Sequence, residues 1–113
     1  MTAVSTYVYL GTAIVAEVIA TSALKACDGF TKFVPTAMTI GFYLVAFWFL
    51  SLTLKAMPTG IVYGIWSGVG IVLICAVSWI WFKQSLDVPA LVGLGLIVLG
   101  VVVVNLFSKS VSL

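Results

Sequence analysis

The carboxyl of Glu17 is the group best placed to do chemistry in this sequence, because it stands alone inside a long apolar run. The run extends from Val4 to Leu24, and none of its other residues is charged. A carboxylate near the centre of a bilayer costs on the order of 2.5 to 3.5 kcal/mol on insertion scales, so acids in such positions usually serve a function. We therefore take Glu17 as the candidate site for a proton or a cation.

The neighbours of Glu17 indicate that this face of the helix looks into a chamber. Residues three and four positions apart lie on one face of a helix, and this spacing groups small, apolar and hydroxyl side chains with Glu17. They are Leu10, Ala13, Ile14, Ala20 and Thr21. If a second copy of the chain brings its own Glu17 close, burial and the like charge both disfavour ionisation. The two carboxyls would then exchange protons near neutral pH as a coupled pair.

Aromatic residues in the next two apolar runs predict what besides a proton the carboxyls hold. Tyr63 and Trp66 are three residues apart and share a helical face, while Tyr43 and Phe47 lie in the preceding run. A desolvated aromatic face attracts a cation by on the order of 2 kcal/mol, so this combination suits a hydrophobic or quaternary cation. A plain packing or lipid-facing role stays open for all four rings. A site that crosses the membrane only when loaded with protons or with the cation would exchange one for the other.

The composition places these residues in a membrane. Of the 113 residues, 64% are hydrophobic and only 7% are charged, whereas about a quarter of the residues of soluble domains are charged. The absence of a basic cluster argues against nucleic-acid binding. The sequence has no histidine and only two cysteines, so we expect no metal and no cofactor. No group of nucleophile, base and orienting residue indicates an enzyme, and the start of the chain lacks the basic region of a cleaved signal peptide.

The apolar runs divide the chain into four lengths, each sufficient for a helix across about 30 Å of hydrocarbon. We predict an all-α, multi-pass protein that forms a single integral membrane domain over residues 1–113. The expected helices cover residues 4–24, 35–54, 59–82 and 88–107. Asp87 is the expected N-cap of the last helix, with Pro89 in its first turn.

Glycines recur every fourth residue in the third run, and small residues at that spacing let another helix approach closely. They are Gly60, Gly64 and Gly68. Gly68 and Gly70 also weaken the helix locally, which predicts a hinge there. In the fourth run, Gly93, Leu96 and Gly100 share one face, and we expect this face to form the seam of a homodimer. Four helices alone enclose little space, so a dimer would supply the chamber.

The lysines leave the orientation in the membrane open. With both chain ends on one side, that side holds the terminal amine, Lys55 and Lys109, and the other side holds Lys25, Lys32 and Lys83. Positive charge favours the cytoplasmic side, and here it is balanced. Insertion in both orientations would permit an antiparallel dimer, while a single orientation set by other features remains the alternative.

Four segments in fixed order carry a resemblance to a known family. They are YLGTAIVAEVIATSALK around Glu17, DGF in the first connection, MPTGIVYGIWSGVGIVL from Met57 to Leu73, and SLDVPALVG at the start of the last helix. Together they resemble the small multidrug resistance family, and in particular its exporters of quaternary ammonium compounds. The resemblance covers nearly the whole chain.

The resemblance implies an antiparallel, dual-topology homodimer in the bacterial inner membrane. It would exchange protons for polyaromatic or quaternary cations by alternating access, with Glu17 as the shared site of proton and substrate. Spacing and resemblance together predict a substrate pocket of nine further residues. These are Trp66, Tyr63, Tyr43, Leu10, Ala13, Ile14, Thr21, Phe47 and Ser67. The resemblance also places Gly68 and Gly70 at the hinge, and the span from Gly93 to Gly100 at the dimer seam.

Other functions remain to be weighed against this one. The guanidinium-exporting branch of the family usually has Trp three residues after the glutamate and Trp-Thr-Gly in the third helix. Here these positions are Ala20 and Trp66-Ser67-Gly68, which favours bulky cations. Gly64 departs from the family's more common Ala and bears on substrate range. A proton-conducting subunit would need Glu17 without the aromatic residues, and a packing subunit would need neither.

Overall fold

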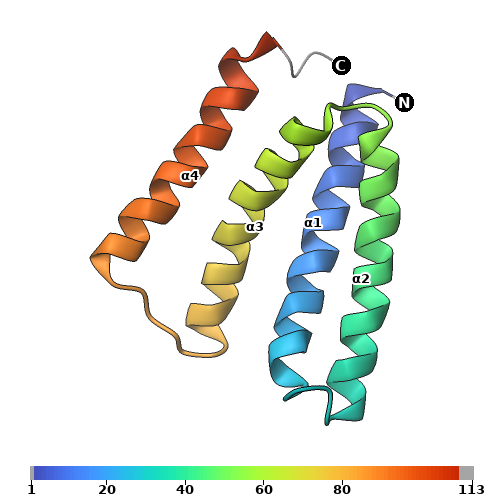
Figure 1. Cartoon of the computed structure of the whole chain (residues 1–113), viewed down its shortest axis with the longest axis vertical. Helices are drawn as coiled ribbons and strands as arrows, with labels where there is room; N and C mark the ends of the chain where they lie inside the picture. The colour runs from blue at the N-terminus through green and yellow to red at the C-terminus, as the bar shows by residue number, and fades with distance from the viewer. Residues whose placement is uncertain (1, 110–113) are drawn as a thin grey trace.

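A computed structural model describes residues 2–109 and shows four helices joined by short connections (Figure 1). The helices are α1 (Ala3–Ala26), α2 (Phe33–Leu54), α3 (Thr59–Ile80) and α4 (Val88–Phe107). Within this part of the chain, all four are long and apolar enough to cross a membrane. The predicted all-α architecture with four spans is therefore confirmed.

Side-chain caps define the starts of α1 and α4. The Thr2 hydroxyl accepts a hydrogen bond from the Ser5 amide at 3.1 Å, and the Ser5 hydroxyl in turn accepts one from the Thr2 amide. At α4, the Asp87 carboxylate accepts a hydrogen bond from the Ala90 amide at 3.1 Å. These bonds satisfy backbone donors that a helix start leaves unpaired. Asp87 is thus the N-cap that its position before Pro89 predicts.

Three helix ends differ from the predicted ones by two residues, and the first of them is the end of α1 at Ala26 and not at Leu24. The second helix begins at Phe33, where Pro35 was the expected start. Proline is compatible with the first turn, because the amide it lacks would have no helical partner there. The third helix ends at Ile80 and not at Phe82, and the chain turns away through Lys83 with a left-handed φ of 55°. Hydropathy marks the apolar run, whereas the backbone turn decides where the helix ends.

The four helices form a thin slab, with α1 between α2 and α3, and with α4 beside α3 at the edge (Figure 1). The slab measures 45 × 35 × 18 Å. Its core lies where α1 meets the start of α3. The buried residues of this core are Leu10, Ile14, Val18, Met57, Val62 and Ile65. By contrast, α4 has no buried residue, so its apolar surface faces lipid or another protein chain.

A close approach at Gly68 joins α4 to the rest of the molecule. Gly68 is buried, and a Cβ atom added there would overlap the side chain of Val101 on α4. Near the end that carries the termini, the Tyr7 hydroxyl also donates a hydrogen bond to Asn105 Oδ1 at 3.4 Å. The third helix is continuous through Gly68 and Gly70. The structure therefore shows Gly68 as a helix contact, and its role as a hinge stays a prediction.

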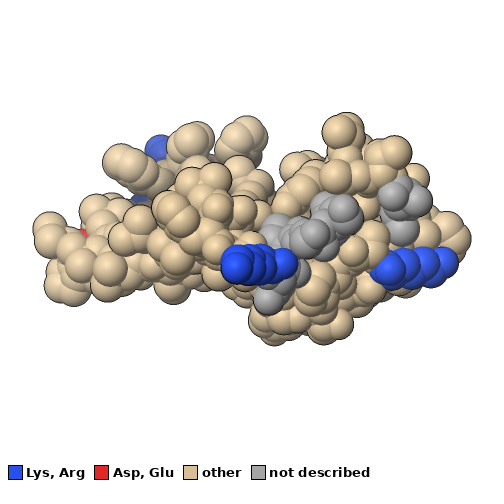
Figure 2. Space-filling view, turned by 90° about the horizontal axis from the view of Figure 1, so that it is seen from above, with Lys and Arg blue, Asp and Glu red and all other residues tan. Residues whose placement is uncertain are grey.

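The helices run alternately up and down, so both chain ends lie at one end of the slab (Figure 1). The connection between α2 and α3, which carries Lys55, lies at the same end. Seen from that end, the lysine side chains lie apart on a mostly uncharged surface and do not gather into one basic patch (Figure 2). Lys25, Lys32 and Lys83 belong to the opposite end. The topology thus distributes the lysines between the two ends as the sequence predicts.

Candidate functional site

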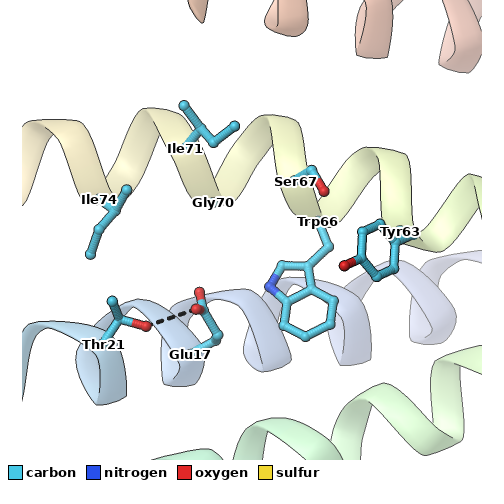
Figure 3. Close-up of a pocket in the computed structure, with 8 residues that line it drawn as sticks. All are labelled: Glu17, Thr21, Tyr63, Trp66, Ser67, Gly70, Ile71 and Ile74. Carbon is cyan, nitrogen blue, oxygen red and sulfur yellow. Dashed lines mark hydrogen bonds between the residues drawn. The ribbon is translucent and has the colours of Figure 1, made fainter. Parts of the chain in front are cut away.

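A pocket between α1 and α3 contains the carboxyl of Glu17 (Figure 3). Its volume is about 250 Å³. Two residues of α1 and six residues of α3 line it. They are Glu17, Thr21, Tyr63, Trp66, Ser67, Gly70, Ile71 and Ile74. Glu17 is the one charged residue among them, so the pocket offers an acceptor with no basic side chain beside it.

The Glu17 carboxylate is held by a side chain of its own helix. Thr21, one turn further along α1, donates a hydrogen bond from Oγ1 to Glu17 Oε1 at 2.8 Å (Figure 3). A hydrogen bond to an ionised acceptor is about twice as strong as a neutral one. Across the pocket, a Cβ atom added to Gly70 would lie 3.9 Å from Glu17 Oε2 and 3.6 Å from Trp66 Cδ1. Gly70 therefore leaves the space beside the carboxylate open.

Tyr63 and Trp66 form an aromatic wall on the other side of this space. Their ring centroids are 6.1 Å apart and the ring planes are inclined by 60°. The Trp66 ring lies between Glu17 and Tyr63, with the nitrogen-bearing side of the indole toward the carboxylate (Figure 3). Tyr63 is 66% exposed, so its ring is accessible at the mouth of the pocket. A cation in this space can meet the carboxylate and a ring face together.

Tyr43 reaches the site from α2 through Thr21. Its hydroxyl lies 2.7 Å from Thr21 Oγ1, within hydrogen-bonding distance. Its ring stacks on Phe47, with centroids 5.9 Å apart and planes 18° from parallel. Both rings line a separate outer groove of about 400 Å³ beside α2. Tyr43 therefore lies between the Glu17 pocket and this groove.

The comparison with known proteins agrees with a membrane protein of four helices. The sequence profile described as Small Multidrug Resistance protein matches residues 5–97 of this chain. The chain belongs to the small multidrug resistance family. This identification agrees with the motifs around Glu17 and Trp66.

Several family members are similar to the chain over nearly their whole length. The quaternary ammonium compound-resistance protein QacE of Escherichia coli is 55% identical over 92% of this chain and 94% of its own. The multidrug transporter EmrE of Escherichia coli strain K12 is 54% identical over the same shares. The quaternary ammonium compound-resistance protein QacG of a Staphylococcus species is 44% identical over 92% of this chain and 97% of its own. This membership makes the chain a multi-pass protein of the bacterial inner membrane, and not an enzyme.

The structure brings five of the predicted family site residues together in the pocket. They are Glu17, Thr21, Tyr63, Trp66 and Ser67. Tyr43 joins them through its contact with Thr21, whereas Phe47 faces the outer groove. Their roles in binding stay predictions.

Three other predicted pocket residues lie elsewhere within the single chain. Leu10, Ala13 and Ile14 are each at most 3% exposed and are buried in the packing of α1 against its neighbours. Helical spacing places these residues on the face of α1 that carries Glu17, but Leu10 and Ile14 belong to the core that α1 forms with the start of α3. A substrate role for these three residues stays a prediction.

The sequence analysis did not include Ile71 and Ile74, which line the pocket, and it assigned Gly70 only to a hinge. A signal for Gly70 and Ile74 was present. Counting from Tyr63 in steps of three and four reaches Trp66, Gly70 and Ile74, all on one face of α3, and steps of four through Ser67 reach Ile71. Extending the aromatic face along the helix would have found the apolar end of the pocket.

The predicted dimer seam is exposed in the single chain. Gly93 and Gly100 are exposed, and a Cβ atom added to either would meet no other helix of the described chain within 4 Å; Leu96 is 63% exposed. This face of α4 is therefore available for another chain, and its role as the seam stays a prediction. Gly64 is likewise exposed, with no atom within 4 Å of an added Cβ.

Proposed function

We propose that this protein is a proton-coupled antiporter that exports hydrophobic, aromatic or quaternary ammonium cations. The observation that carries the proposal is the Glu17 carboxylate in a pocket walled by Tyr63 and Trp66, without a basic residue in its lining. Such a site attracts a cation by charge and by the aromatic quadrupoles. The names of the relatives, which refer to multidrug transport and to resistance against quaternary ammonium compounds, support this substrate class.

Competition for one carboxylate would couple the two fluxes. When Glu17 is ionised it attracts the cation, and when it is protonated the charge that holds the cation is gone. A transporter that changes its open side only when loaded with one or the other then exchanges them. Protons that enter down their gradient displace the cation to the outside, and alternating access is the required motion.

A second copy of the chain is part of the proposal. In the 18 Å slab, the pocket opens at Tyr63, and nothing on the described chain covers the exposed faces of α2 and α4. An antiparallel partner would close the chamber and bring the second Glu17 near the first. The even distribution of lysines between the two ends supports insertion in both orientations.

Transport in proteoliposomes tests the proposed function. A vesicle interior that is acidic relative to the medium should drive uptake of tetraphenylphosphonium against its concentration, because leaving protons exchange for the entering cation. Glu17→Gln should abolish this uptake. Asp28→Asn serves as the matched control, since Asp28 is an exposed acid in the loop after α1.

Two results would contradict the proposal. Uptake by Glu17→Gln at the wild-type rate would show that the carboxyl is not the coupling site. Uptake of guanidinium but not of tetraphenylphosphonium would show that the substrate is a small planar cation and not a bulky one.

A further inference from the structure

Three side chains from two helices form a continuous series of short contacts that ends on the functional carboxyl. Thr21 Oγ1 lies 2.8 Å from Glu17 Oε1 and 2.7 Å from the Tyr43 hydroxyl. Thr21 is therefore the bridge between Glu17 on α1 and Tyr43 on α2. It is partly buried and lines the Glu17 pocket.

The direction of this series follows from the number of protons available. A threonine hydroxyl has one hydrogen to donate and two lone pairs to accept with, and an ionised carboxylate can only accept. When Glu17 is ionised, Thr21 must use its hydrogen for the carboxylate. The second contact of Thr21 can then form only if Tyr43 donates.

Protonation of Glu17 permits the opposite direction. The carboxyl then carries a hydrogen that it can donate to Thr21, and Thr21 can donate to Tyr43. Each hydroxyl only rotates about its C–O bond, and no heavy atom has to move. The Tyr43 hydroxyl thereby becomes an acceptor, and its own hydrogen is free for another partner.

We propose that Thr21 is a positioning residue that transmits the protonation state of Glu17 to Tyr43, through a hydrogen-bond chain whose direction reverses with that state. The inference rests on the proposed function, because it concerns the same carboxyl. It adds a route by which loading of the site reaches α2. The ring of Tyr43 stacks on Phe47 in the outer groove, so the hydrogen-bond series ends at the boundary between the pocket and that groove.

Few other titratable groups face this hydrogen-bond series. Tyr63 lines the pocket from α3. Lys25, one turn beyond Thr21 on α1, is turned aside, with its Nζ 5.3 Å from the centre of the Phe82 ring. No residue of α4 lines the pocket. Changes at Thr21 should therefore act on Glu17 directly and not through a neighbouring charge.

Binding of tetraphenylphosphonium to the detergent-solubilised full chain, measured as affinity against pH, tests the inference. As the pH is lowered, the pH at which affinity begins to fall reports protonation of Glu17 in the free protein. Thr21→Val removes the hydroxyl at nearly constant shape and should raise this pH by about one unit, because the ionised carboxylate loses a charge-assisted hydrogen bond. Thr21→Ser keeps the hydroxyl, so its affinity should begin to fall at the same pH as that of the wild type.

Tyr43→Phe tests whether the three groups act in series. It removes the donor to Thr21 and should raise the same pH by about half a unit, since Thr21 still bonds the carboxylate. With Thr21→Val already present, adding Tyr43→Phe should cause no further shift, because the hydroxyl that links Tyr43 to Glu17 is already absent. Thr53→Val is the matched control, since Thr53 is buried and its hydroxyl bonds, among the residues that the structure describes, only the Phe49 carbonyl of its own helix.

The outcomes separate this inference from the proposed function. Three results would contradict the hydrogen-bond series but leave the proposed antiporter intact. In the first, Thr21→Val does not change the pH at which affinity falls. In the others, Thr21→Ser shifts this pH as much as Thr21→Val does, or the shifts of Thr21→Val and Tyr43→Phe add. Binding by the wild type without any pH dependence would overturn the proposed function itself. If Thr21→Val does not fold, Tyr43→Phe alone decides the question. The inference is then overturned if Tyr43→Phe leaves the pH dependence of binding unchanged.

Discussion

At the scale of single residues, the site combines one acid with groups that leave it accessible. Thr21 holds one carboxylate oxygen, and the absence of a side chain at Gly70 leaves room beside the other. Trp66 and Tyr63 then present ring faces to that room. The expense of placing Glu17 in a membrane is understandable if the carboxylate alternately binds a proton and a cation.

Replacing the aromatic wall should weaken cation binding. Trp66→Ala removes a ring face worth on the order of 2 kcal/mol to a desolvated cation, which corresponds to roughly a 30-fold loss of affinity for tetraphenylphosphonium. Isothermal titration calorimetry of the solubilised protein measures this loss. Trp79→Ala is the control, because Trp79 lies on α3 but outside the Glu17 pocket and is 69% exposed. Equal losses in both variants would argue against a direct contact between Trp66 and the cation.

At the scale of helices, hydropathy is sufficient to predict four spans, and the Asp87 cap predicts the start of the last one. The sequence could not show which part of a helical face is covered by a neighbour. Leu10 and Ile14 share a face with Glu17, yet they are buried in the core, while Glu17 and Thr21 further along α1 line the pocket. Phe47 likewise carries an aromatic ring on α2 and meets a different groove. Periodicity assigns a residue to a face, and only the packing of the helices assigns that face to a site.

The contact between α3 and α4 makes a prediction at this scale. Gly68→Ala should lower the free energy of unfolding in detergent by about 1 to 3 kcal/mol, because the new methyl group overlaps Val101. Adding Val101→Ala should recover much of this loss, since it removes the overlapping atoms. Gly64→Ala is the control, because no other helix of residues 2–109 lies within 4 Å of the added methyl group. A loss at Gly64 equal to that at Gly68 would show that the effect comes from the glycines themselves and not from the helix contact.

At the scale of the whole molecule, the single chain forms a slab only 18 Å thick, and we propose that a second copy completes the chamber. The chain's pocket is open on one side, α4 buries no residue, and the connections at both ends carry lysines. These features are compatible with an inverted second copy. The chain topology was predictable from the apolar runs, whereas the geometry of the dimer depends on contacts between two chains.

The balance of lysines should control orientation and activity together. Lys55→Ser with a lysine introduced beside Lys32 should bias insertion toward one orientation, because positive charge is retained on the cytoplasmic side. Labelling of single cysteines from each side of the membrane measures the bias. If the working dimer is antiparallel, this variant expressed alone should confer less resistance to ethidium, and coexpression with an oppositely biased variant should restore it. Full resistance from a population shown to have one orientation would support a parallel dimer.

The central claim is that one carboxyl, that of Glu17, binds the proton and the cation in competition. Its most direct test is the affinity of the solubilised protein for tetraphenylphosphonium across pH, in the native chain and in Glu17→Gln. We predict that binding by the native chain strengthens as pH rises and Glu17 loses its proton, and that Glu17→Gln does not bind. Binding by Glu17→Gln with native affinity and without pH dependence would contradict the account.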